Sequence, residues 1–256
     1  MFTQTILLVS LVIFWYMFVL FITALIRRDN SVADIAWGPG FLLAALAPLW
    51  WHRPIGLLPV LATVLVAVWA MRLAVHVAMR NWGKQEDWRY AGWRRDWGQW
   101  FVPRTFLQVF LLQGFLLIIV ALPVLWINTF GGGITWLAVL GAFVWLKGFL
   151  WETVGDYQLI RFLKNPAHKG KLLRSGLWRY SRHPNYFGEV TQWWGIWLMA
   201  LSVSGGWFTI FGPLIITFLI MKVSGIPLLE ERHKSKPEFR EYKRRTSALI
   251  PWFPKK

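Results

Sequence analysis

The sequence predicts an all-α protein, a polytopic integral membrane helix bundle of about seven transmembrane helices, because it is unusually apolar and its charges are few and unevenly placed. Of its 256 residues, 56% are hydrophobic and 16% are charged. In soluble domains about a quarter of the residues are charged. Several apolar runs reach or approach the roughly 20 residues that a helix needs to cross a bilayer. We therefore expect residues 1–256 to form a single membrane domain.

The predicted spans follow the apolar runs in chain order. They are residues 5–26, 33–51, 57–79, 106–127, 134–154, 187–202 and 207–228. No basic segment and no small-residue cleavage site accompany the first run, so we expect a retained span rather than a cleaved signal peptide. The second run contains Pro39 and Pro48, which favour a kink or a re-entrant shape.

Lysines and arginines gather on alternate connections between these spans. Of the 28, 24 lie in the first short loop, in loops 80–105 and 155–186, or in the tail 229–256, whereas Arg53 alone lies in the opposite loops. Because Lys- and Arg-rich loops stay in the cytoplasm, we expect the N-terminus outside and the C-terminus in the cytoplasm. Orientation and attraction to anionic membrane lipid then explain the net charge of +16. Nucleic acid is not expected as a partner.

Several other functional classes lack their motifs in this sequence. Without cysteine the chain has no disulfide, iron–sulfur cluster or thiolate zinc site. The five histidines form no H-E-x-x-H pattern, so we expect no metal site. A Walker loop, a G-x-G-x-x-G fingerprint and a G-x-S-x-G elbow are also missing.

The stretch GLWRYSRHPNYFGE, at Gly176–Glu189, places a dense group of hydrogen-bonding side chains directly before the sixth span. Its polar members are Arg179, Tyr180, Ser181, Arg182, His183, Asn185, Tyr186 and Glu189. Arginines are the usual partners of phosphate oxygens, and Tyr, His and Asn fix orientation through single hydrogen bonds. A positively charged flanking loop would explain the arginines, but it requires neither the histidine nor the carboxylate.

Ionisable residues also occur inside or at the ends of the predicted spans, where they are costly and by default mark a functional site. They are Asp34, Arg72, His76, Lys147, Glu152, Asp156, Glu189 and Lys222. Arg72 and His76 are four residues apart and share one helix face, as do Glu152 and Asp156. We expect a pocket open to the cytoplasm that suits a ligand with an anionic half and a second, lipophilic ligand. Alternatively, these groups pair with one another to hold the helices together, and the two lysines extend to the membrane interface.

Several segments together resemble the bacterial relatives of the steroid 5-alpha-reductases. They are VADIAWGPG, WAMRLAVH with EDWRY, ETVGDYQLIRFLKNP, GLWRYSRHPNYFGE, VSGIPLLEE and YKRRTSALIPWFP, in consistent order from near residue 30 to the end. The resemblance implies a bacterial inner-membrane enzyme that uses NADPH to reduce a conjugated carbon–carbon double bond. It also implies a lipophilic, steroid-like or isoprenoid-like small-molecule substrate.

The resemblance also implies a set of cofactor-binding residues on the cytoplasmic loops and the later helices. Asn185 and Glu189 match the family's Asn-x-x-Gly-Glu element, Asp156 its Asp at the end of the fifth span, and Arg72 its third-span Arg. Lys164 stands where an Arg is usual, and Glu231 falls near a His of the steroid enzymes. The full set comprises Arg72, Glu152, Asp156, Arg161, Lys164, Lys171, Arg174, Tyr180, Arg182, His183, Asn185, Tyr186, Glu189 and Glu231.

The implied catalytic residues are Asp34, His76 and Tyr90. When hydride reaches the beta carbon, negative charge develops on the carbonyl oxygen, so a donor must stabilise it and a proton must reach the alpha carbon. Asp34 lies near the family's Gln-Glu pair, and we expect it to act as the acid. Trp69 takes the place of the family's Tyr, and an indole is not a proton source. This leaves Tyr90 or His76 as surrogate donor, or a related hydrophobic unsaturated substrate.

Two other functions stay open at this point. The isoprenylcysteine carboxyl methyltransferases share a similar C-terminal element and bind S-adenosylmethionine there. Residues that suit that chemistry are Arg182, His183, Pro184, Tyr186, Gly188, Glu230 and Glu231. A non-catalytic lipid-binding membrane protein is the third possibility, and it predicts no nucleotide binding.

Overall fold

The computed structural model describes residues 1–255, which are mostly helical and contain no strand. The chain folds into two compact units. The first unit comprises Met1–Ala138 and Met199–Gly212, and the second comprises Val139–Leu198 and the chain from Pro213 onwards. The predicted all-α, polytopic membrane fold is confirmed, while the side of the membrane that each terminus faces stays a prediction.

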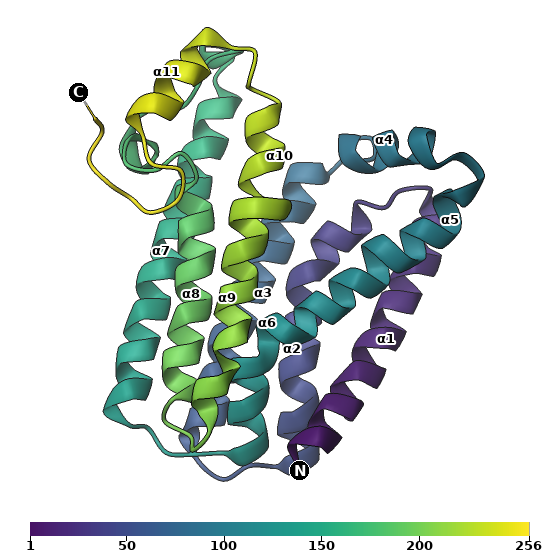
Figure 1. The fold of residues 1–256 in the computed structure, drawn as a ribbon, viewed down its shortest axis with the longest axis vertical. Helices are drawn as coiled ribbons and strands as arrows, with labels where there is room; N and C mark the ends of the chain where they lie inside the picture. Colours follow the sequence, from purple (N-terminus) through teal and green to yellow (C-terminus); the bar gives the residue numbers. More distant parts are fainter. Residues whose placement is uncertain (256) are drawn as a thin grey trace. The chain divides into compact units, whose positions relative to one another are not determined.

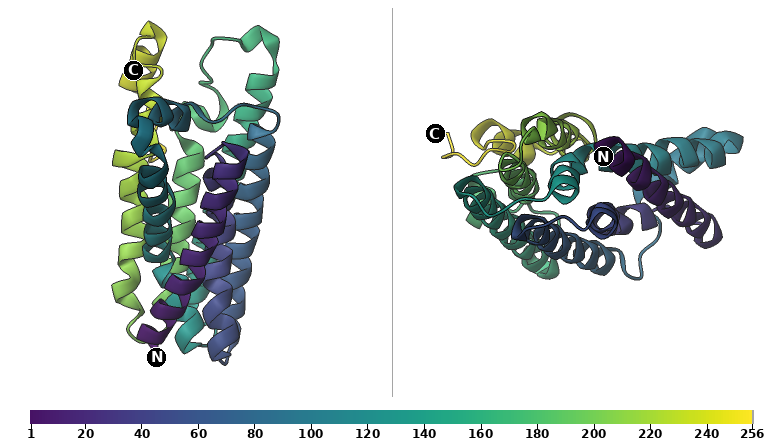
Figure 2. Two further views of the ribbon diagram at one scale, coloured as in Figure 1. Left: turned by 90° about the vertical axis from the view of Figure 1, so that its right-hand side faces the viewer. Right: turned by 90° about the horizontal axis from the view of Figure 1, so that it is seen from below.

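The first unit is built on four long helices, with shorter helices between the third and the fourth and one more, η5, that returns from later in the chain. They are α1 (Phe2–Arg27), α2 (Val32–His52), α3 (Leu57–Asn81), α4 (Trp88–Trp97), η1 (Gly98–Trp100), α5 (Phe101–Arg104), the π-helix η2 (Thr105–Leu111), α6 (Leu112–Phe130) and η5 (Gly206–Ile210). Helices α2 and α3 lie side by side in both side-on views (Figures 1 and 2). They approach so closely that a Cβ on Gly38 would lie 2.6 Å from the carbonyl oxygen of Ala70. Helix α2 runs through both of its prolines without a break.

The second unit contains α7 (Trp136–Lys164), η3 (Pro166–His168), η4 (Gly176–Arg179), α8 (Pro184–Ala200), α9 (Phe211–Phe218), the π-helix η6 (Leu219–Val223), α10 (Ile226–Glu231) and α11 (Pro237–Arg245). The first residues of α7 and α9 belong to the first unit.

Glycines bring α7 and α8 into backbone contact. A Cβ on Gly148 would lie 2.6 Å from the carbonyl oxygen of Gly188, and one on Gly195 would lie 2.7 Å from that of Gly141. Small residues of this kind let helices approach closely inside a membrane, where packing rather than a hydrophobic driving force holds them together. The close approach sets which side chains of α7 and α8 can meet.

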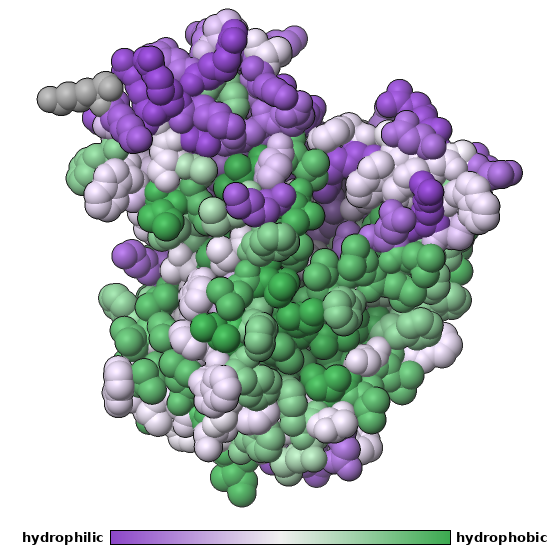
Figure 3. Space-filling view, viewed as in Figure 1, coloured by the Kyte–Doolittle hydropathy of each residue, from purple (hydrophilic) through white to green (hydrophobic). Residues whose placement is uncertain are grey.

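Six helical segments of the described chain are long and apolar enough to cross a membrane. They are Phe2–Arg27, Val32–His52, Leu57–Asn81, Trp88–Phe130, Trp136–Lys164 and Gly206–Glu231. The remaining predicted span, residues 187–202, coincides with α8, which has 17 residues. In the first unit hydrophilic side chains gather at the end that carries α4, and in the second at the end that carries α11. On the face shown in Figure 3, the surface between these ends is mostly hydrophobic.

Candidate functional site

Asp34 is the centre of a polar cluster in the first unit, which we call the Asp34 cluster (Asp34, Asp87, Arg89 and Tyr90). The Arg89 guanidinium donates to Oδ2 of Asp34 at 2.5 Å, and the Tyr90 hydroxyl donates to Oδ1 at 2.8 Å. Arg89 also donates to Oδ1 of Asp87 at 2.8 Å. Tyr90 is 2% exposed, whereas the side chains of Asp34, Asp87 and Arg89 are 18%, 21% and 23% exposed. Two predicted catalytic residues, Asp34 and Tyr90, are therefore in direct contact.

Local structure explains why Arg89 and Tyr90 reach Asp34, although more than 50 residues separate them in sequence. Asp87 caps the N-terminus of α4 by accepting from the Arg89 backbone N–H, a favourable N-cap arrangement. The Asp87 backbone N–H donates to the Ser31 hydroxyl at 2.8 Å. These contacts tie the start of α4 to the α1–α2 turn. Burial raises the pKa of the Asp87 carboxyl, but hydrogen bonds from Arg89 outweigh burial and leave the pKa below its ordinary value.

A second set of contacts strengthens the same connection. Glu86 accepts from the Asn30 backbone N–H at 2.9 Å and pairs with Arg94 at 2.8 Å. Arg94 also donates to the carbonyl oxygen of Arg28 at 3.3 Å. Residues on both sides of Asp87 are thus fixed to the α1–α2 turn, so the first turn of α4 presents its side chains to Asp34.

The other residues predicted in this unit lie on α3. Arg72 and His76 are one helical turn apart and half-buried. Trp69, on the preceding turn, is 2% exposed and packs edge-to-face on Phe41 at 5.4 Å. His76 as a catalytic residue and Arg72 as a cofactor ligand stay predictions.

The second unit contains two carboxylate–amide pairs between α7 and α8. The side-chain amide of Gln192 donates to Oε2 of Glu152 at 2.6 Å, and that of Asn185 donates to Oδ1 of Asp156 at 3.0 Å. Glu152 is 3% exposed and Asp156 is 5% exposed. The carbonyl oxygens of both amides are buried, and neither accepts a hydrogen bond from the part of the chain that the structure describes. Each pair therefore leaves one buried amide oxygen that accepts no hydrogen bond within the described chain.

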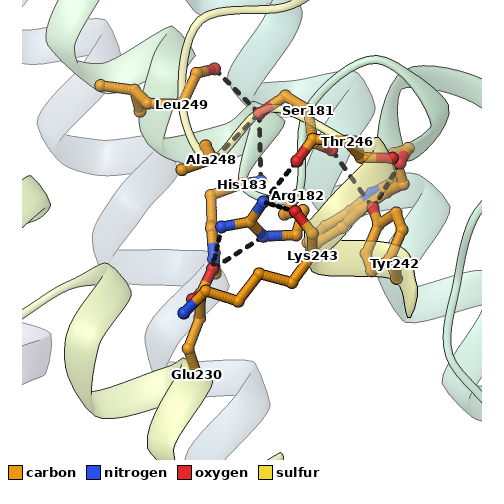
Figure 4. Close-up of polar contacts among 10 residues, drawn as sticks. Ser181, Arg182, His183, Glu230, Tyr242, Lys243, Thr246, Ala248 and Leu249 are labelled. Carbon is orange, nitrogen blue, oxygen red and sulfur yellow. Dashed lines mark hydrogen bonds and ion pairs between the residues drawn. The ribbon is translucent and has the colours of Figure 1, made fainter. Parts of the chain in front are cut away.

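A separate polar group, which we call the Glu230 cluster, comprises Arg182, His183, Glu230 and Lys243. It joins the residues before α8 to the C-terminal segment (Figure 4). Arg182 donates to Oε1 of Glu230 through Nε at 2.8 Å and also to the carbonyl oxygens of Lys243 and Thr246. The Lys243 ammonium lies 2.8 Å from Oε2 of Glu230, and His183 Nε2 lies 3.4 Å from Oε1. The guanidinium of Arg182 therefore donates its hydrogen bonds to groups of the protein itself.

The backbone continues this connection. The Arg182 N–H donates to the Ser247 carbonyl oxygen at 2.9 Å, and the Ser181 hydroxyl donates to that of Leu249 at 2.8 Å. The Tyr242 hydroxyl donates to the carbonyl oxygen of Trp178. Burial raises the pKa of Tyr242 and lowers that of His183, although Glu230 partly offsets the shift for His183. Burial therefore favours the neutral form of both side chains.

The predicted basic ligands of the loop after α7 lie on the surface of the second unit. Arg161, Lys164 and Lys171 are exposed. Arg174 and Arg179 line an open pocket of about 150 Å³ together with Arg245, Glu241, Tyr242, Thr246 and Pro254.

The remaining predicted residues differ in their environment. Tyr186 stacks on His183 at 5.6 Å, and Glu189 lies half-buried one turn after Asn185 on α8. The Tyr180 carbonyl oxygen accepts from the Trp252 backbone N–H at 2.9 Å. The Glu231 side chain is 70% exposed and lies 3.4 Å from Lys234, so the structure does not bring Glu231 into the Glu230 cluster.

The residues of these clusters that were not among the predicted reductase residues include Gln192, Glu230 and Arg89, and also Asp87 and Lys243. Gln192 lies within a predicted span but is not ionisable, so the criterion that singled out Glu152 passed over it; any polar residue inside a span would have been the wider signal. Glu230 differs from Glu231 by one position, which sequence spacing alone did not resolve. Arg89 belongs to the EDWRY segment that carries the resemblance, but it was counted only among the loop charges that set the topology.

The fold and these clusters define a polytopic helical membrane protein with ionisable groups buried inside both of its units. More particularly, the chain belongs to the family described as "Protein of unknown function (DUF1295)", whose model matches residues 20–246.

The chain is also similar to the 3-oxo-5-alpha-steroid 4-dehydrogenase 1 of several mammals. Identity to the Bos taurus protein is 32% over 114 residues, which cover 44% of this chain and 40% of the relative. Identity to the Homo sapiens protein is 32% over 116 residues, covering 44% and 41%. The chain thus spans about two fifths of the length of the curated relatives it matches. The resemblance to the steroid 5-alpha-reductases is confirmed; no solved structure matches the chain.

Proposed function

We propose that the protein is a membrane-embedded, NADPH-dependent reductase of a carbon–carbon double bond conjugated to a carbonyl in a lipophilic, steroid-like or isoprenoid-like molecule. The observation that carries the proposal is the contact between Asp34 and Tyr90, in a chain similar to 3-oxo-5-alpha-steroid 4-dehydrogenases. A buried phenol beside a carboxylate is a suitable donor for an oxygen on which negative charge develops.

The chain's own residues have defined tasks in this proposal. In the proposal the Tyr90 hydroxyl, which donates to Asp34 in the described structure, turns to the substrate carbonyl oxygen, and a protonated Asp34 donates to the phenol oxygen; the proton that the enolate takes up comes from Tyr90 and is replaced from Asp34. Arg89 holds the Asp34 carboxyl in place and is a positioning residue. The partly buried surroundings limit contact with water and so strengthen these interactions.

The second unit supplies groups that suit a dinucleotide. NADPH, when bound, supplies the hydride. The free amide oxygens of Asn185 and Gln192 fit the carboxamide N–H groups of a nicotinamide or the amine of an adenine. Exposed Arg161, Lys164 and Lys171 suit phosphate oxygens. We assign Arg182 instead to holding the C-terminal segment, because its donors are already used.

The direct test is consumption of NADPH by purified protein in the presence of lipophilic enones, including a 3-oxo-4-ene steroid. Asp34→Asn and Tyr90→Phe should each lower kcat at least about a hundredfold, the usual contribution of a positioned acid. NADPH should still protect both variants from heat. Asp96→Asn and Tyr157→Phe, at exposed positions, are matched controls that keep activity. Full activity of both site variants would assign the Asp34 cluster a purely structural role.

The methyltransferase alternative is separated by cofactor protection. A ligand at a hundred times its Kd adds roughly 2.7 kcal/mol to the free energy of unfolding. We expect NADPH, and not S-adenosylmethionine, to raise the unfolding temperature. Protection by S-adenosylmethionine alone would favour the methyltransferase, and protection by neither would favour a non-catalytic lipid-binding protein.

A further inference from the structure

A pocket on the second unit is lined by three arginines that the fold brings together from two separate parts of the chain. Arg174 and Arg179 belong to the segment between α7 and α8, and Arg245 is the last residue of α11. All three are exposed, and the cavity that they line has a volume of about 150 Å³. Pockets that enclose a whole small-molecule ligand have roughly 300–1,000 Å³. The cavity therefore fits a single group of a larger ligand, or a small anion.

The positive charge of these arginines is only partly compensated. Among the described lining residues Glu241 is the one carboxylate, and it lies 3.9 Å from Arg174 and 3.5 Å from Arg245. Ion pairs at such exposed positions are weak. Arg179 lies over the Tyr180 ring at 6.0 Å and has no ion pair with the carboxylates of residues 1–255. Three guanidinium groups and one carboxylate leave the lining with a net charge of +2.

Hydrogen bonds hold both parts of the pocket in place. The Tyr242 hydroxyl donates to the carbonyl oxygen of Trp178, which directly precedes Arg179. The Lys255 backbone N–H donates to the carbonyl oxygen of Arg245 at 2.9 Å. The backbone next to the arginines is thus fixed, although like charges that lie close together repel one another. An arrangement of this kind favours an anion as the occupant of the pocket.

Trp178 also links the pocket to one of the carboxylate–amide pairs. The Trp178 indole N–H donates to the Gly155 carbonyl oxygen at 3.1 Å, and the Trp178 carbonyl oxygen accepts from Tyr242, which lines the pocket. Gly155 directly precedes Asp156, the partner of Asn185. One tryptophan therefore connects the wall of the pocket to the part of α7 that carries this pair.

We infer that this pocket binds a phosphate monoester, and that its occupant is the 2′-phosphate of NADPH. Arginine pairs with phosphate through two parallel hydrogen bonds, and in soluble dinucleotide-binding folds an arginine accommodates the 2′-phosphate of NADP. A phosphate monoester carries about 1.5–2 negative charges at pH 7, which matches the net charge of the lining. This assignment rests on the proposed function, and it makes Arg174, Arg179 and Arg245 the residues that select NADPH over NADH.

The experiment compares how NADPH and NADH protect detergent-purified, full-length protein from thermal unfolding, in phosphate-free buffer at constant ionic strength. The dependence of the unfolding temperature on nucleotide concentration gives an apparent affinity. We expect wild type to bind NADPH about a hundredfold more tightly than NADH, because each charge-assisted hydrogen bond contributes about tenfold. Arg179→Gln and Arg245→Gln should each weaken NADPH binding about tenfold, and together they should nearly abolish the preference. Binding of NADH should stay within about twofold in these variants, since NADH lacks the 2′-phosphate.

The matched control removes two positive charges from α11 outside the pocket. Arg240→Gln with Arg244→Gln, both exposed, should keep the preference for NADPH. Equal protection of wild type by the two nucleotides, or an undiminished preference in the Arg179/Arg245 double variant, would overturn the inference and leave the reductase proposal standing. Protection by neither nucleotide would contradict the proposed function as well.

Inorganic phosphate separates the phosphate of the cofactor from free phosphate as the occupant. When phosphate replaces chloride at equal ionic strength, we expect the preference of wild type for NADPH to fall, because the anion competes for the 2′-phosphate position. Free phosphate is the occupant if it stabilises wild type but not the Arg179/Arg245 double variant while NADPH and NADH protect equally, and that result would overturn the inference. If the double variant does not fold, the single glutamine variants and Arg179→Lys, which should keep most of the preference, decide the question.

Discussion

At the scale of single residues, Asp34 is the side chain on which the proposed chemistry depends. One oxygen accepts from a phenol and the other from a guanidinium. Breaking a buried ion pair by removing one partner costs more than the pair contributes, because the remaining charge is left without compensation. Arg89 should therefore be more sensitive to substitution than exposed arginines on the same helix.

Arg89→Met should lower the free energy of unfolding by about 1–3 kcal/mol, the cost of leaving a largely buried polar group unsatisfied. Adding Asp34→Asn should restore part of the loss, because the effects of substitutions at two contacting residues on the free energy of unfolding do not simply add. Denaturant unfolding in neutral detergent measures both. Arg95→Met, at an exposed position, is the control and should stay within about 0.5 kcal/mol. If Arg89→Met equals the control, Arg89 does not hold Asp34.

The buried His183 makes stability depend on pH. Because burial lowers its pKa in the folded protein, the unfolded chain binds a proton more readily below the ordinary pKa of about 6.5. The folded state is therefore fully stable above that value and loses stability as pH falls through it. His183→Gln retains an N–H donor but does not titrate. The unfolding temperature of this variant should fall less than that of wild type between pH 7.5 and 5.5. An equal fall in the two proteins would contradict this account.

At the scale of elements, the contact of α7 with α8 positions both carboxylate–amide pairs. Gly195→Ala would place a methyl group 2.7 Å from the carbonyl oxygen of Gly141, so the helices must separate. We expect a loss of about 1–3 kcal/mol, as for other overpacked interiors. Gly92→Ala in α4, where nothing lies within 4 Å, should instead be neutral or stabilising by up to about 1 kcal/mol. Thermal unfolding compares the two, and equal effects would show that the close approach is not limiting.

The helices themselves were largely predictable, because the thickness of the bilayer dictates the length of an apolar run. The helical segment α4 was expected to be loop, since its tryptophans alternate with arginines and glycines and give no apolar period. The contact of Asp34 with Tyr90 depends on tertiary pairing between the α1–α2 turn and the start of α4, which no local pattern encodes. The pairing of Glu152 with Gln192 depends in turn on how closely α7 and α8 approach.

At the scale of the whole molecule, we propose that each of the two compact units has its own role in the reaction. The first contains the donor pair Asp34 and Tyr90, and the second contains the acceptors and basic residues suited to a dinucleotide. Asp156→Asn should therefore weaken protection by NADPH, because it disturbs Asn185, while Asp34→Asn should leave that protection intact. Thermal shift in the presence of NADPH distinguishes the two variants, and equal loss of protection in both would argue against the division.

The most direct test of the central claim is transfer of deuterium to a lipophilic enone from NADPH that carries two deuterium atoms at the reactive nicotinamide carbon, followed by mass spectrometry of the product. Reduction by this protein predicts a saturated ketone that carries one deuterium at the beta carbon, formed by wild type and not by Asp34→Asn. A saturated product without deuterium, or no reduction of any enone by protein that NADPH protects from heat, would contradict it.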